Sequence, residues 1–350
     1  MAQLGPVAHC ETGQNGSRTA RALRRVAPAG VMAVAAAVIG APPIVAPQAQ
    51  ALPNGDSIMM VPTVPGPPQT EHLGAATYLK QHPDAAPQGA NDFGCKPTAQ
   101  HPYPVVLAHG TDSSAYSDWS GLSPQLAQAG LCVFAMNYGG KPGKDSYGTE
   151  DVWDSSAQVG TFVDQVLAAT GAPKVDMVGF SQGASVTRYY IDKLGGAPKV
   201  DQWIGLASPS YGGVMYGLVP VADKVPGIYK LVQAASSLAA VQQAAGSPFM
   251  NDLNSGGDTV AGVRYTTIGS RVDEMIQPFG NIALKGAGAT NLVLQDLCSA
   301  DLTGHFHMVY DPFVQQTVVN LLAPDRAVAP NCVPVALGTG ISDVVLAAHS

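Results

Sequence analysis

The chain has 350 residues, of which 12% are charged and 46% hydrophobic, and its formal net charge is −7. Four of the 18 basic residues and one of the 25 acidic residues lie before position 52, which leaves 14 basic and 24 acidic residues beyond it. An acidic chain of this kind has no basic patch for the phosphate backbone, so nucleic acid is excluded as a partner. Roughly 300 residues are enough for one α/β domain with a large core.

The first 51 residues have a pattern that is typical of an export signal. A stretch with four arginines over 18–25 precedes an apolar run at 29–41, and Ala49-Gln50-Ala51 offers a small-x-small cleavage site. The run is too short to span a bilayer, so a retained anchor is disfavoured. We expect a signal peptide over 1–51, a mature start at Leu52 and no transmembrane span in the mature chain. The Arg24-Arg25 pair permits twin-arginine export, and the composition is typical of a secreted bacterial protein.

The remaining chain alternates strand-like and helix-like segments. Residues 52–90 are predicted to form an extended arm, because 52–70 are rich in Pro and Gly and 71–102 are polar. We expect strands at 103–108, 132–136, 175–178, 203–207, 264–268 and 292–297, and helices at 122–129, 152–169, 183–194 and 311–322. This alternation predicts an α/β fold with a mainly parallel sheet and helices on both faces.

One segment interrupts the alternation. Residues 209–258 are apolar and poor in charge, and they follow the segment at 203–207. They are either a helical excursion that packs on the core or a small helical cap that lines a pocket. We therefore predict a main domain at 91–335 that carries this insertion, followed by a C-terminal tail at 336–350.

The most informative motif is Gly179-Phe180-Ser181-Gln182-Gly183. An apolar run precedes it and a helix-like segment follows, which is the Gly-x-Ser-x-Gly nucleophile elbow of the α/β-hydrolases. Side chains at 179 and 183 would collide with neighbouring backbone in so tight a turn. The motif predicts that Ser181 is a nucleophile, with an idle tight turn as the alternative.

A serine nucleophile needs a base and an acid, in the chain order Ser, Asp or Glu, His. His305 is favoured as the base over His307, and His349 is the penultimate residue and is expected to fray. Asp273 is favoured as the acid because it directly follows the strand expected at 264–268. Glu274 is its main rival, and Asp296 and Asp301 are weaker ones.

The transition state also needs two backbone donors for its oxyanion. One is expected at Gln182, directly after the nucleophile. The other is expected at Thr111, in the loop Leu107-Ala-His-Gly-Thr-Asp112 that follows the first strand. His109 precedes the nucleophile in the chain, so we interpret it as a residue that positions this loop.

Four cysteines lie beyond the signal segment, and four cysteines allow three pairings. Sequence proximity favours Cys95 with Cys132 and Cys298 with Cys332, each closing a loop of roughly 35 residues worth about 3–4 kcal/mol. A metal site is not indicated, because no pair has the Cys-x-x-Cys spacing. An even count in an exported chain fits two structural disulfides.

The segments Val106-Leu-Ala-His-Gly-Thr111, Gly179–Gly183 and Asp273-Glu-Met-Ile-Gln-Pro278 resemble the secreted actinobacterial class 2 lipases and are similar to Candida antarctica lipase B. The resemblance covers about residues 90–335. It implies an α/β-hydrolase that cleaves carboxylic esters, including acylglycerols, at a site that uses no cofactor and no metal. It implies the roles of nucleophile, acid and base for Ser181, Asp273 and His305, oxyanion donors at Thr111 and Gln182, and the two cysteine pairings above.

Three alternatives remain at this point. The chain could be a cutinase-like or polyester-cleaving esterase with an open site, or an acyltransferase in which an alcohol replaces water. A binding protein without activity is a third, and the ordered Ser, Asp and His positions argue against it. The substrate is expected to be a lipid or another small ester, met in solution or at a lipid–water interface.

Overall fold

The computed structural model describes residues 57–141, 145–213 and 237–349. The expected signal peptide at 1–51 and residues 214–236 of the expected cap lie outside these ranges. All described residues belong to the unit Ala51–Ser350.

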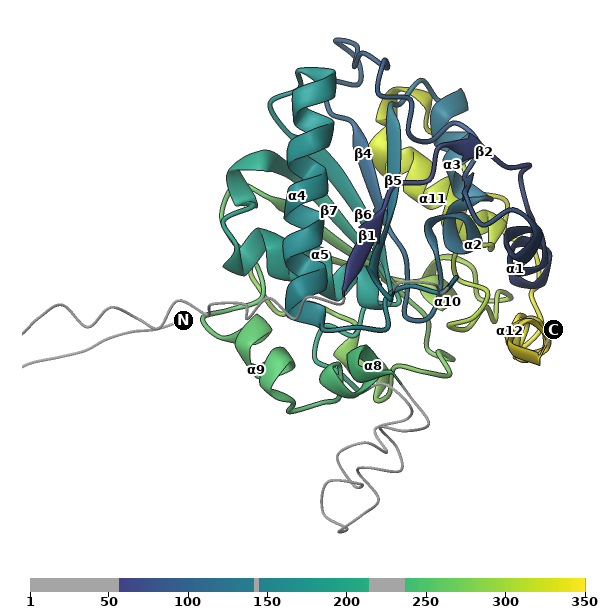
Figure 1. Cartoon of the computed structure of the whole chain (residues 1–350). Coiled ribbons are helices and arrows are strands. Elements are labelled where there is room, and N and C mark those ends of the chain that lie inside the picture. Colours follow the sequence, from purple (N-terminus) through teal and green to yellow (C-terminus); the bar gives the residue numbers. More distant parts are fainter. Residues whose placement is uncertain (1–56, 142–144, 214–236, 350) are drawn as a thin grey trace, which may run out of the picture. The chain divides into compact units, whose positions relative to one another are not determined.

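A seven-stranded sheet forms the centre of the fold, with strand order β1-β5-β4-β6-β7-β8-β9 (Figure 1). The strands are β1 (Ile58–Met60), β4 (Val105–Ala108), β5 (Val133–Gly140), β6 (Val175–Phe180), β7 (Val200–Leu206), β8 (Arg264–Gly269) and β9 (Thr290–Val293). All neighbouring pairs are parallel except β1 and β5, which are antiparallel. The predicted α/β fold with a mainly parallel sheet is confirmed.

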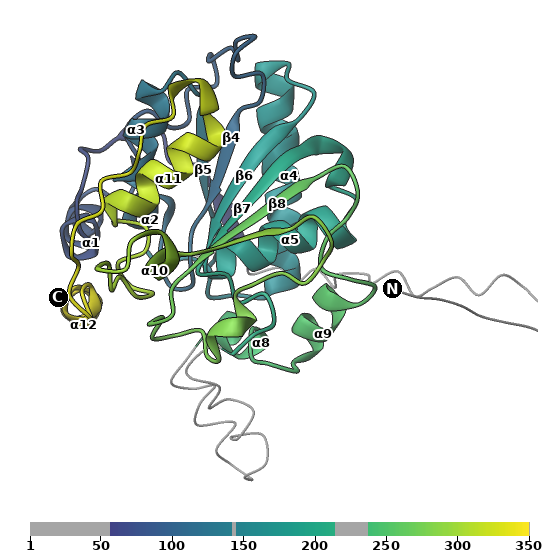
Figure 2. The ribbon, with the colours of Figure 1, turned by 180° about the vertical axis from the view of Figure 1, so that it is seen from behind.

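Helices cover both faces of the sheet. On one face lie α4 (Val152–Thr170) and α5 (Gln182–Lys193), and on the other α2 (Ala115–Trp119), α3 (Leu122–Gln128) and α11 (Pro312–Leu322) (Figures 1 and 2). Side chains along β4 alternate between the two faces: Val105 and Leu107 belong to one core cluster, and Val106 and Ala108 to the other. This is the period-2 pattern of a strand whose two faces are both buried.

The segment expected to be an extended arm is folded into the domain instead. β1 joins the main sheet, and β2 (Val64–Pro65) pairs with β3 (Ala85–Ala86). Between them lies α1 (His72–Gln81), which buries Ala75 and Leu79. These two residues are four positions apart on one helical face, and so narrow an apolar stripe among polar neighbours gives a weak sequence signal.

Two C-terminal expectations also need correction. The strand expected at 292–297 ends at Val293, and α10 (Leu294–Leu297) follows it. A short apolar run at a sheet edge does not by itself distinguish a strand from a single helical turn. The expected tail contains α12 (Ile341–His349), which packs against α1, so His349 lies in a helix. The insertion contains α8 (Leu238–Gln242) and α9 (Pro248–Asn254).

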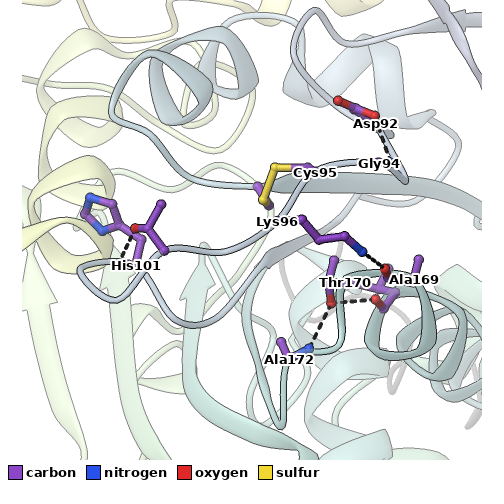
Figure 3. The surroundings of a disulfide bond; sticks show 11 residues. Asp92, Gly94, Cys95, Lys96, His101, Ala169, Thr170 and Ala172 are labelled. Atoms are coloured by element: carbon purple, nitrogen blue, oxygen red, sulfur yellow. Dashed lines mark hydrogen bonds between the residues drawn. A yellow bond between two sulfur atoms is a disulfide. The ribbon is translucent and has the colours of Figure 1, made fainter.

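Both favoured disulfides are formed, Cys95–Cys132 and Cys298–Cys332. The first connects the loop before β4 to the residue before β5, and Figure 3 shows its surroundings. In the same loop the Lys96 ammonium donates to the carbonyl of Ala169, 2.6 Å away at the end of α4. A cation at this position satisfies a carbonyl that the helix leaves without an intrahelical donor.

In the described part of the chain, no helix is long and apolar enough to cross a membrane.

Candidate active site

The candidate nucleophile Ser181 lies on the turn between β6 and α5. Its backbone has φ 50° and ψ −119°, a conformation that costs a non-glycine residue free energy and is found where the surrounding structure enforces it. A Cβ at Gly179 would lie 2.4 Å from the Ala184 nitrogen, and one at Gly183 would lie 2.0 Å from the Ala108 carbonyl oxygen. The expected crowding around both glycines is therefore present, and no side chain fits at either position.

Asp273 lies on the loop that follows β8. Its Oδ1 accepts hydrogen bonds from the backbone N–H groups of Met275 (2.8 Å) and Ile276 (2.7 Å). These two bonds fix the carboxylate and leave Oδ2 directed at His305 Nδ1, 3.0 Å away. Only 1% of Asp273 is exposed, so this interaction takes place away from solvent.

His305 lies on the loop between α10 and α11, and its Nε2 is 3.0 Å from Ser181 Oγ. The loop is held at its far end by Asp311, which caps α11 through Val314 N–H (2.9 Å) and accepts from the Thr303 hydroxyl (2.7 Å). The structure thus brings Ser181, Asp273 and His305 into one hydrogen-bonded chain that is almost entirely buried.

The rival residues form no part of the hydrogen-bonded chain from Asp273 through His305 to Ser181. His307 lines a different cavity, next to Tyr310 and Gln315. Asp296 is on α10 and forms an ion pair with Arg271. Glu274 contacts the backbone of His305, because its Oε2 accepts from the His305 N–H at 2.5 Å.

The loop with Thr111 approaches the site from the end of β4. Its position is fixed by Asp118 on α2, whose two carboxylate oxygens accept from Gly110 N–H and from the Ser113 hydroxyl, each at 2.7 Å. The Thr111 hydroxyl oxygen accepts from Gln243 Nε2 (3.2 Å), which leaves the hydroxyl proton free to point elsewhere. Within the described ranges, the backbone N–H groups of Thr111 and Gln182 form no hydrogen bond with the protein.

His109 contacts the loop that carries Thr111. Burial lowers the pKa of its imidazole, an effect that the carboxylate of Asp118 partly opposes. The ring is neutral: Nδ1 donates to the carbonyl of Gly110 (2.7 Å), and Nε2 accepts from Tyr138 N–H (3.3 Å). It also stacks on the Tyr138 ring at 4.2 Å between centroids. These contacts agree with the interpretation of His109 as a positioning residue.

A largely apolar cavity of about 280 Å³ opens onto Ser181 and His305. Its walls come from segments that are far apart in the sequence: Thr111 after β4, Ala240 on α8, Ile276 on the loop that carries Asp273, and Val344 on α12. The insertion at 209–258 and the C-terminal segment therefore both contribute to the wall of the same cavity.

Sequence reasoning did not find several contributors to the site, among them Asp118, Gln243 and Val344. Asp118 lies in a short helix that was not predicted, and Gln243 and Val344 lie in segments whose sequence contains no motif. Only for Asp118 was there a usable signal, since Ser114 and Asp118 follow a strand end as a helix N-cap and a first-turn acid do.

Comparison with known proteins gives a consistent result. The family model "Lipase (class 2)" matches residues 102–318. Two curated triacylglycerol lipases, from Pseudarthrobacter phenanthrenivorans and Burkholderia plantarii, are each 38% identical over 92 residues, which is 25% of this chain. These matches cover 27% and 24% of the two relatives, so they span about a quarter of each.

Among solved structures, Aspergillus fumigatus lipase B superposes with a TM-score of 0.56 at 23% identity. The superposition covers 75% of this chain and 63% of that protein. At this identity the likeness concerns the fold.

Proposed function

The chain belongs to the class 2 lipase family, and from that premise we propose that it is an exported bacterial carboxylic ester hydrolase that cleaves acylglycerols through a covalent acyl-enzyme. The observation that carries the proposal is the hydrogen-bonded chain from Asp273 through His305 to Ser181, with both links at 3.0 Å. Hydrogen-bond contact between nucleophile and base, with an acid orienting the base, is the geometry that activates a serine hydroxyl.

In the first step His305 Nε2 takes the proton of Ser181 as Oγ attacks the ester carbonyl carbon. Asp273 keeps the proton on Nδ1, so that Nε2 is the basic nitrogen, and it stabilises the imidazolium that forms. The imidazolium then protonates the leaving alcohol. Water, activated by the same histidine, hydrolyses the acyl-serine and regenerates the enzyme.

The developing oxyanion needs donors that are already in place. The backbone N–H groups of Thr111 and Gln182 have no acceptor in the described part of the chain, so they are available to it. The Thr111 hydroxyl supplies a third donor while Gln243 holds its oxygen. Removing one such donor costs about 3 kcal/mol of transition-state stabilisation in comparable sites.

The apolar walls of the cavity support an acyl chain as the group that it holds. Phe180, Ile276, Val309 and Val344 line it near Ser181. Burial of apolar acyl surface against such walls contributes roughly 25 cal/mol per Å² to binding. The chemistry proposed here requires no metal or organic cofactor.

Export is also part of the proposal. It is supported by the signal-like segment at 1–51 and by two disulfides, which persist in oxidising compartments. The proposed domain limits are 1–51 for the signal peptide, 52–90 for an N-terminal segment, 91–335 for the hydrolase domain with its cap at 209–258, and 336–350 for the C-terminal segment.

The decisive test compares the wild-type enzyme with Ser181→Ala on p-nitrophenyl esters of increasing acyl length and on emulsified triacylglycerol. We expect ester hydrolysis in the wild type and a loss of about 10⁶-fold in kcat in the variant, as when the nucleophile of a triad is removed. A fluorophosphonate probe should label the wild type and leave the variant unlabelled. Wild-type activity in Ser181→Ala would refute the mechanism, and transfer of the acyl group to added glycerol in place of water would favour an acyltransferase.

A further inference from the structure

Two consecutive acidic residues hold two different parts of the same histidine. Asp273 Oδ2 lies 3.0 Å from the ring nitrogen Nδ1 of His305, and Glu274 Oε2 accepts from the His305 backbone N–H at 2.5 Å. Both side chains are buried. Fixing the ring at one end and the backbone at the other leaves His305 little freedom to move away from Ser181.

The contact with Glu274 is built into the loop. A Cβ at Gly304 would lie 2.1–2.3 Å from the carboxylate atoms of Glu274, so the backbone comes this close only because residue 304 has no side chain. The presence of Gly304 directly before His305 is thereby explained by packing against an acid and not by the turn alone.

The arrangement has an energetic cost. Glu274 Oε1 is buried and has no hydrogen-bond partner among the described residues. A buried carboxylate with an unsatisfied oxygen destabilises a fold unless it is neutralised or its one strong contact compensates. A neutral amide in its place would accept the same bond without bringing a charge. The hydrogen bond to His305 N–H therefore does not by itself explain why residue 274 is an acid.

We infer that Glu274 is a positioning residue for the base: it holds the backbone of His305, and its negative charge stabilises the imidazolium that forms when His305 takes the proton of Ser181. The inference rests on the function proposed above and adds a second carboxylate to the support of His305. The other charged or titratable groups around His305 are Asp273 on its ring, His307 on its own loop, and His72, Asp112 and Asp118 among the cavity residues. Among the acidic side chains of the described residues, only Asp273 and Glu274 form hydrogen bonds with His305.

Two variants separate the hydrogen bond from the charge. Glu274→Gln keeps the size and an acceptor oxygen but removes the charge. With less stabilisation of the imidazolium, the acid limb of the kcat/KM profile should move to lower pH and the plateau kcat should fall several-fold. Glu274→Ala also removes the acceptor, and kcat on a soluble short-chain ester should fall about 10–100-fold with KM within about two-fold, because the base is displaced.

Asp296→Asn is the matched control, since Asp296 is an exposed acid on α10 that pairs with Arg271 and does not contact His305. It should leave both the pH profile and kcat unchanged. If Glu274→Ala does not fold, as judged by near-UV circular dichroism, the pH profile of Glu274→Gln decides alone. An unmoved acid limb in Glu274→Gln overturns the inference. If Ser181→Ala is inactive at the same time, the proposed function stands and only the role of Glu274 is lost.

Discussion

Buried polar groups at the two ends of strand β6 differ in how well they are hydrogen-bonded. At the carboxyl end, Ser181 and its partners are buried. Asp273 Oδ1 accepts from the backbone of its own loop, and the links from Asp273 to His305 and from His305 to Ser181 join different loops. At the amino end, Asp176 is 7% exposed, and its Oδ1 has no hydrogen-bond partner in the described ranges. Burial, and secondly the nearby charge of Asp201, raise the pKa of Asp176 to about 7.

The difference shows what a buried carboxylate does in each setting. Asp273 accepts two backbone N–H bonds and one imidazole contact, so its charge is compensated and available for chemistry. Asp176 lies on β6, five residues before Ser181, and there Arg264, Lys174 and a backbone hydrogen bond compensate the charge only in part. Replacing each acid in turn should therefore change activity at one end and stability at the other.

The largest effect is expected for Asp273→Asn. The amide cannot hold the proton on Nδ1, so His305 adopts the wrong tautomer and kcat should fall about 10⁴-fold with the fold intact. Initial rates on a p-nitrophenyl ester, together with a thermal melt, measure both quantities. A fall of less than ten-fold would mean that Asp273 is not the acid, and would remove the contrast between the two ends.

A smaller effect is expected for Asp118→Ala. Gly110 N–H and the Ser113 hydroxyl would lose their shared acceptor, the loop would shift, and the Thr111 N–H would be misplaced. We expect kcat to fall about 10–100-fold with little change in KM. Asp118→Asn, which keeps one acceptor oxygen, should recover most of the rate, and equal losses in the two variants would contradict this account.

The smallest effect on activity is expected for Asp176→Asn, because this change acts on stability. A raised folded-state pKa means that the native state holds the proton more tightly than the unfolded state, whose Asp pKa is about 3.9. The free energy of unfolding of the wild type should therefore fall as pH rises from about 4 to about 7. Above pH 7 Asp176 should lower it no further.

The variant lacks this cost, so its advantage over the wild type should grow between pH 4.5 and pH 8 by on the order of 3 kcal/mol. Urea unfolding at the two pH values measures the difference, and kcat serves as the control because Asp176 is remote from the site. If the free energies of unfolding of variant and wild type differ by the same amount at both pH values, then ionisation of Asp176 does not destabilise the fold.

The core of the candidate site could be predicted because its signals are local. Ser181 lies in a five-residue motif, and Asp273 and His305 each follow a strand or precede a helix in the expected chain order. Crowding around Gly179 and Gly183 was predicted from the motif. At Gly179 the crowding atoms belong to the turn itself, and at Gly183 they belong to Ala108 and His109 at the end of β4.

The supporting residues could not be predicted because their roles depend on contacts between distant segments. Gln243 reaches Thr111 across 132 positions, and Val344 lines a cavity together with His72 and with residues of the expected main domain. The pairing of β1 with β5 is likewise a long-range choice that three apolar residues at 58–60 do not reveal. Glu274 was weighed only as a rival acid, since a backbone hydrogen bond has no sequence signature.

The route of the chain after Cys332 has a practical consequence for anyone who handles this protein. The Cys298–Cys332 disulfide and the bond from Leu302 N–H to the Val335 carbonyl fasten this segment beside the loop that carries His305. The helix that follows places Val344 in the cavity wall. A group attached to the last turn of α12 would therefore lie within about one and a half helical turns of Val344. Immobilisation through this helix would put the support close to the cavity that opens onto Ser181.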